Sequence, residues 1–74
     1  MPKLYSARII LTALHKAGFS VVSQKVSHIK LFKKEAVTNF TVIVPNHKEV
    51  AVGTFASILK QAGMSKEEFE KLIK

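Results

Sequence analysis

Three short runs of β-branched and aromatic residues lie near the middle of this 74-residue chain, at residues 19–23, 27–32 and 40–44. Such runs are typical of β-strands. Pro45 ends the third run, because proline cannot donate a hydrogen bond to a continuing ladder. The sequence therefore predicts three strands in a row.

Helical patterns flank the three runs on both sides. Ser6 can cap a helix at about residues 7–17, whose apolar side chains recur at helical spacing. A second helix is predicted at about residues 53–63, and a capping box at residues 65–68 begins a short last helix. The order α-β-β-β-α-α predicts an α+β fold, and all 74 residues are expected to form one domain.

The register of the first hairpin follows from which side chains must share a face. A two-residue turn at residues 25–26 would mix core side chains with His28 on one face. A three-residue loop at residues 24–26 pairs Ser23 with Ser27 and separates the two kinds of side chain. We therefore expect a three-stranded antiparallel sheet with helices on one face. The core face would carry Phe19, Val21, Ile29 and Leu31, and the open face His28, Lys30 and Phe32.

Val26 fits poorly into this loop. The last residue of a three-residue hairpin loop usually adopts a left-handed conformation, which suits glycine and disfavours a β-branched side chain. A valine at this position predicts either strain of about 1 to 2 kcal/mol or a different loop shape.

The net charge of +7 is concentrated in the first two thirds of the chain. Residues 1–48 hold eight cationic residues and one acidic residue, whereas residues 49–74 hold four of each. Such a basic segment is expected of a surface that meets a polyanion. Ordinary solubilising lysines are the alternative interpretation.

Several classes of protein and site are excluded by what the sequence lacks. There is no cysteine, no aspartate and no His-x-x-x-His spacing, so a metal site is not expected, and no cofactor motif is present. A serine triad would need a carboxylate to orient its histidine, and the basic segment offers only Glu35. No apolar run approaches the roughly 20 residues that cross a bilayer. We expect a cytoplasmic protein with no membrane partner.

His28 is the strongest candidate for chemistry. It stands between Lys25 and Lys30, directly after Ser27, and Lys30 projects about 7 Å away on the same face of the strand. RNA cleavage needs only proton transfer and charge neutralisation, because the 2′-hydroxyl is itself the nucleophile. Proton transfer by a positioned histidine contributes roughly 10² to 10⁴ in rate, and the two lysines could hold the phosphate. An exposed strand histidine without a function is the alternative.

The other two histidines are weaker candidates. His15 lies on the predicted first helix, away from its apolar stripe, and is interpreted as a surface residue. His47 follows Pro45 in a loop that could approach the open face of the sheet, although a turn or capping function is the simpler interpretation.

Three segments together carry a family resemblance: residues 24–30 (QKVSHIK), 44–47 (VPNH) and 53–65 (GTFASILKQAGMS). With their spacing, they closely resemble the HicA toxins, also called YcfA-like proteins. The resemblance runs from the first helix to the last.

The resemblance implies a fold like that of the double-stranded RNA-binding domain. It also implies an mRNA interferase that cleaves RNA, stops translation and is neutralised by a HicB antitoxin, being a monomer when free and a hetero-oligomer with the antitoxin. The catalytic histidine of the family's Gly-Ser-His motif corresponds to His28, and the motif serine to Ser27. Val26 occupies the glycine position, which leads to the hypothesis that this chain is an attenuated variant.

Three functional hypotheses therefore stand. The first is a ribonuclease in which His28 transfers protons, Ser27 orients it or the substrate, and Lys25 and Lys30 bind phosphate. The second is a non-catalytic RNA-binding module of the same fold. The third is an interaction protein whose basic face meets an acidic partner.

Overall fold

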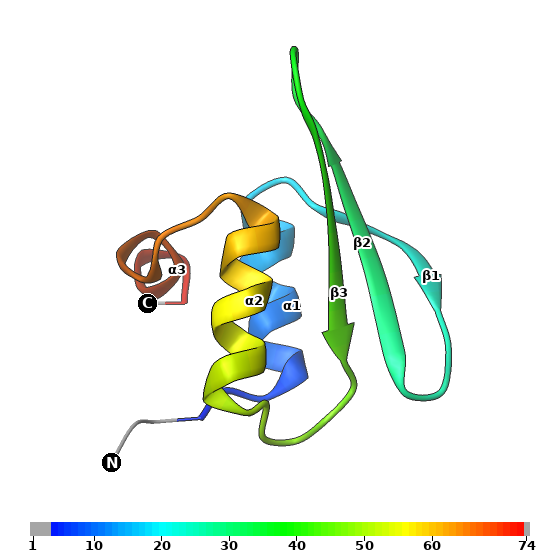
Figure 1. The fold of residues 1–74 in the computed structure, drawn as a ribbon, viewed down its shortest axis with the longest axis vertical. Coiled ribbons are helices and arrows are strands. Elements are labelled where there is room, and N and C mark those ends of the chain that lie inside the picture. Colours follow the sequence, from blue (N-terminus) through cyan, green and yellow to red (C-terminus); the bar gives the residue numbers. More distant parts are fainter. Residues whose placement is uncertain (1–3, 74) are drawn as a thin grey trace.

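A computed structural model describes residues 4–73 and has the element order α-β-β-β-α-α, as predicted (Figure 1). Lys3 and Lys74, which enter the charge comparison, lie outside the described residues. Each predicted element is present, with ends displaced by one or two residues. The elements are α1 (Ala7–Lys16), β1 (Ser20–Gln24), β2 (His28–Lys34), β3 (Asn39–Pro45), α2 (Val52–Ala62) and α3 (Lys66–Leu72).

The three strands form one antiparallel sheet in the order β1-β2-β3. The helices lie on one face of it, and the other face is left uncovered (Figure 1). Alternation along β2 and β3 directs one set of side chains toward the helices. Both the α+β class and the one-sided arrangement of helices are thus confirmed. The sheet contributes Ile29, Leu31, Val42 and Val44 to the buried core. The first helix and the segment after it contribute Ile10, Leu14 and Phe19.

The predicted register of the first hairpin is wrong. Ser23 pairs with Lys30 rather than with Ser27, and the Lys25 amide donates to the His28 carbonyl at 2.9 Å. The connection is therefore a tight turn with Val26 and Ser27 at its tip. An irregularity between Val21 and Ser23 then shifts the ladder by one residue.

This β-bulge explains why Val21 was nevertheless predicted correctly to lie on the same face of the sheet as Leu31. The tight turn alone would have exchanged the faces of β1, because side chains alternate along a strand. The extra residue at Val22 restores the alternation, so that Val21 lies opposite Leu31 and Ser20 opposite Phe32. Val21 itself stays 53% exposed at the edge of the sheet, unlike the buried Leu31.

The strain expected at Val26 is absent. No residue other than glycine has a positive φ within residues 4–73, and the Val26 side chain is 96% exposed at the hairpin tip. Of the two outcomes predicted for this position, the structure has the second, a different loop shape.

The ends of the helices follow from local chemistry. The Ser6 hydroxyl accepts a hydrogen bond from the Ile9 amide at 3.2 Å and caps α1, as predicted. Gly63 ends α2 in the left-handed conformation, with φ of 65°. The predicted capping box is also present, because Ser65 and Glu68 exchange two hydrogen bonds at the start of α3.

A cluster of three aromatic rings attaches α3 to the rest of the fold. Phe69 is fully buried, and its ring centroid lies 5.0 Å from that of Tyr5 and 4.8 Å from that of Phe55. The Lys16 ammonium group also donates to the Leu72 carbonyl at 3.0 Å. The last helix is therefore an integral part of the hydrophobic core. None of the helices in the described part of the chain could traverse a bilayer.

Candidate active site on the open face of the sheet

The open face is the surface of the sheet opposite the helices, and its side chains form rows across the strands. Lys30 of β2 stands between Ser23 of β1 and Ile43 of β3, and His28 pairs with Pro45. His28 and Lys30 are both exposed. The structure therefore places these two side chains on one accessible surface, as the alternation of β2 predicted.

Ser27 contacts the imidazole of His28 directly. The Ser27 Oγ lies 3.0 Å from His28 Nδ1, and both residues are exposed. When Nδ1 carries its proton and donates it to Oγ, the lone pair of Nε2 is free to accept a proton. The protonated imidazole keeps the same bond and donates from Nε2. The contact thus holds one ring orientation through both halves of an acid–base cycle.

Backbone hydrogen bonds fix the position of this pair. The Asn46 amide donates to the Ser27 carbonyl at 2.9 Å, and the Lys25 amide donates to the His28 carbonyl at 2.9 Å. The first bond ties the site to the loop after β3, and the second ties it to β1. The candidate base is consequently held from both sides, although it begins a strand beside a hairpin tip.

Lys25, His28 and Lys30 line a common depression of about 300 Å³, together with Ser23 and Ile43. The turn brings Lys25 beside His28, and the alternation of β2 brings Lys30 there. The depression therefore combines a proton-transfer group with two cations and contains no carboxylate. This combination suits an anionic ester.

His47 is not brought into this depression. It lies with Ser6, Arg8 and Lys48 around a separate hollow at the start of α1, and its carbonyl accepts from the Ala7 amide at 2.9 Å. This position favours a turn or capping function for His47 over a function as a second catalytic group. His15 is exposed on α1, as predicted.

Sequence reasoning missed Ser23 and Ile43 as lining residues. The expected register paired Ser23 with Ser27 rather than with Lys30, because the tight turn and the bulge at Val22 were not foreseen. Ile43 lies between the buried Val42 and Val44 in β3 and therefore faces the open side of the sheet, but no sequence motif identifies it as a site residue. A correct register for both hairpins would have identified the two residues.

The acidic residues all lie away from the open face. Glu35 follows β2 and forms an ion pair with Lys33 at 3.1 Å, Glu49 precedes α2, and the other three belong to α3. Hydrogen bonding from the Ser65 backbone amide holds the pKa of Glu68 below its ordinary value. Within residues 4–73, no three His, Cys, Asp or Glu side chains are grouped so that they could hold a metal ion.

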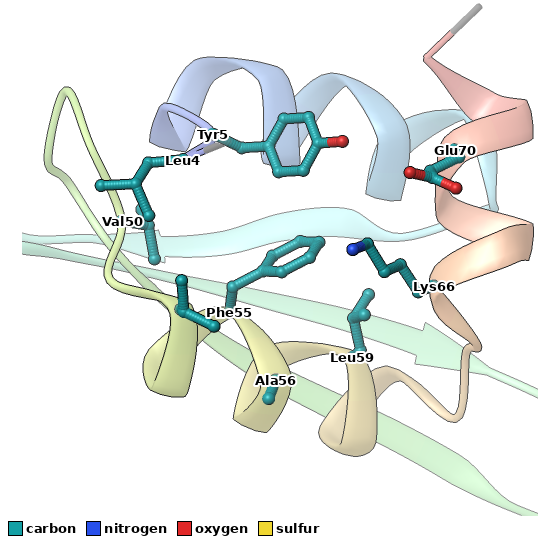
Figure 2. A pocket seen from close by; sticks show the side chains of 9 residues that line it. Leu4, Tyr5, Val50, Phe55, Ala56, Leu59, Lys66 and Glu70 are labelled. Carbon is teal, nitrogen blue, oxygen red and sulfur yellow. The ribbon is translucent and has the colours of Figure 1, made fainter. Parts of the chain in front are cut away.

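A second hollow, of about 400 Å³, lies among the helices and the segment before α1 (Figure 2). Its walls are mainly apolar side chains such as Leu4, Phe55 and Leu59, with Lys66 and Glu70 contributed by α3. It contains no histidine and lies apart from the His28 depression. The candidate proton-transfer residue His28 therefore lies on the sheet and not at this hollow.

Comparison with known families identifies a match over most of the chain. The model of the family described as the HicA toxin of bacterial toxin–antitoxin systems matches residues 7–64. This range includes the whole sheet, α1 and α2, and excludes α3. A comparison with curated proteins gives no significant match.

Proposed function

Because the chain belongs to the HicA toxins of bacterial toxin–antitoxin systems, we propose that it is an endoribonuclease that cleaves mRNA and thereby stops translation. In this proposal His28 transfers the protons, and Lys25 and Lys30 bind the phosphate. No metal or other cofactor takes part, and one domain of 74 residues carries the activity.

The proposed reaction begins with a 2′-hydroxyl of the RNA. Nε2 of His28 takes the proton of this hydroxyl while its oxygen attacks the adjacent phosphorus. The bond from phosphorus to the 5′ oxygen of the next nucleotide breaks, and that oxygen takes up a proton. The products are a 2′,3′-cyclic phosphate and a 5′-hydroxyl. The lysine ammonium groups offset the negative charge that develops on the phosphate oxygens.

The bond between Ser27 Oγ and His28 Nδ1, at 3.0 Å, is the observation that carries this proposal. A solvated strand histidine needs no such partner, whereas an acid–base catalyst needs a defined ring orientation. Ser27 acts here as a positioning residue. The two lysines at the same depression supply the charge that a phosphodiester requires.

The proposal is tested by incubating mRNA with the wild-type protein, His28→Ala and His15→Ala, each with and without EDTA. Cleavage by wild type and His15→Ala should persist in EDTA, and His28→Ala should lose at least about 100-fold in rate. His15 is the matched control, because it is exposed on α1 outside the site. Undiminished cleavage by His28→Ala would refute the assignment.

The same experiment separates the other two hypotheses. RNA binding by wild type and His28→Ala without cleavage by either would indicate a non-catalytic RNA-binding module. A protein that neither binds nor cleaves RNA would instead be an interaction protein for an acidic partner.

A HicB antitoxin is the proposed protein partner. The toxin should be a monomer when free and should form a hetero-oligomer with the antitoxin. Light scattering of the toxin alone and after coexpression with the protein encoded beside it tests both statements. An unchanged toxin mass after coexpression would contradict the partnership.

A further inference from the structure

Phe32 is an aromatic side chain on the face of the sheet opposite the core. It lies four residues after His28 on β2, so the two side chains project from the same face about 13 Å apart. Its cross-strand neighbours are Ser20 and Thr41, both exposed. Phe32 is half-buried and belongs neither to the core nor to the side chains packed against it.

The Phe32 ring has no aromatic or cationic partner in the described part of the chain. Throughout residues 4–73, Phe32 makes no ring–ring or cation–ring contact, unlike Phe55 and Phe69. Its neighbours across the sheet have short hydroxyl side chains, which leave the ring accessible. The shielded part of the ring contributes to folding, and the part that remains accessible can contact a ligand.

Cationic side chains stand before and after this ring on the same strand. Lys30 lies two residues before Phe32 and Lys34 two residues after it, so the three side chains project from the same face of β2. None of the five acidic residues lies on this face. A ring set among cations on an open sheet is the arrangement with which proteins hold single-stranded nucleic acids: the cations follow the phosphates and the ring stacks on a base.

We propose that Phe32 is a base-stacking residue and that the substrate of this site is unpaired RNA. The inference rests on the proposed ribonuclease function. One base of the strand stacks on Phe32 while a phosphate a few nucleotides away lies at His28 and Lys30. The ring therefore sets how the strand is placed relative to the catalytic histidine.

A duplex does not fit this arrangement. Its bases are already stacked and paired inside the helix, and a ring that stands on a sheet cannot reach their flat faces without unpairing them. Recognition of double-stranded RNA uses phosphate and 2′-hydroxyl contacts, whereas sheets with exposed aromatic side chains stack splayed bases. The open face thus favours unpaired RNA, even though the fold resembles that of a duplex-binding domain.

The test measures binding in the His28→Ala background, so that the RNA is not cleaved. Three ligands are compared: single-stranded oligoadenylate, an oligomer of the same length without bases, and a duplex. Phe32→Leu should weaken binding of oligoadenylate roughly 5- to 150-fold and leave binding of the other two ligands unchanged. Phe32→Tyr should bind like the parent, and Thr41→Ala controls for a change beside the ring.

Each outcome distinguishes the inference from the function on which it rests. Equal binding of oligoadenylate by Phe32→Leu and its parent would overturn the stacking, while cleavage by wild type would leave the ribonuclease intact. Absence of RNA binding and of cleavage by the wild-type protein would overturn both. If Phe32→Leu does not fold, binding by the His28→Ala parent still tests the proposal. Equal affinity of this parent for oligoadenylate and for the oligomer without bases would refute it.

Discussion

The hydroxyl oxygen of Ser27 lies 3.0 Å from Nδ1 of His28, across the junction between a hairpin tip and the central strand. Neighbouring side chains on a strand point to opposite faces, so this contact depends on the turn geometry at Ser27. The same residue receives the Asn46 amide through its carbonyl. One serine therefore orients the imidazole and anchors the strand.

Replacement of Ser27 should lower the cleavage rate without preventing RNA binding. Ser27→Ala removes one neutral hydrogen bond to the imidazole, which predicts a loss in kcat of roughly 2- to 10-fold. Ser27→Thr keeps the hydroxyl and should restore most of the rate. Ser23→Ala is the matched control in the same depression. A rise in KM with unchanged kcat would instead show that Ser27 contacts the substrate.

Two glycines, Gly53 in the first turn of α2 and Gly63 at its C-cap, should respond to alanine in opposite ways. At Gly63, with φ of 65°, an added Cβ would lie 2.8 Å from Cε1 of the Phe40 ring, and Gly63→Ala should cost about 1 to 3 kcal/mol. At Gly53 an added Cβ meets nothing within 4 Å, and Gly53→Ala should stabilise the protein by up to about 1 kcal/mol. Urea unfolding measures both. Equal effects of the two substitutions would contradict the geometry.

Acid should weaken the start of α3 through Glu68. Its pKa is lowered in the folded state from 4.5, mainly by the hydrogen bond from the Ser65 amide. A lowered carboxyl pKa contributes stability that is complete above the unfolded pKa and is lost as the pH falls through the folded pKa. Wild type should therefore lose more stability than Glu68→Gln as the pH is lowered from 7 to 3 in urea unfolding. Glu67→Gln controls for the loss of one charge, and parallel pH profiles of wild type and Glu68→Gln would contradict the linkage.

Val26→Gly tests whether this chain is an attenuated toxin. The 96% exposed side chain stands beside Ser27 at the hairpin tip, and the substitution restores the Gly-Ser-His motif that the resemblance implies. Growth arrest on induction should therefore increase. The change in unfolding free energy should remain below about 1 kcal/mol, because Val26 has no positive φ. Val37→Gly, at the equally exposed tip of the other hairpin, is the control, and unchanged toxicity of Val26→Gly would dismiss the hypothesis.

The elements of this fold were predictable because their determinants are local. Ser6 caps α1, Gly63 ends α2 and Pro45 ends β3, each for a reason contained in its own side chain or backbone. The family relationship was predictable for a similar reason, since its motifs are short and their spacing is preserved. The match of the family model to residues 7–64 confirms this relationship.

The register of the first hairpin was not predictable in the same way. It depends on a bulge at Val22, and a bulge is decided by the pairing of two strands rather than by either strand alone. The assignment of faces survived because an even change in register keeps each side chain on its side of the sheet. Ser23 lies between the turn and the bulge and pairs with Lys30 instead of the predicted Ser27. The position of His47 at a separate hollow, in the loop after β3, left no signal in the sequence.

The placement of the five acidic residues away from the open face makes the molecule electrically lopsided. A body with such a charge distribution experiences a torque near a polyanion, so its orientation at encounter is not random. In the proposed function, the face that carries Lys25, Lys30 and Lys34 would turn toward the RNA before any contact forms. For the proposed ribonuclease, this orientation would present His28 to the RNA at encounter, so that a shallow site would be sufficient.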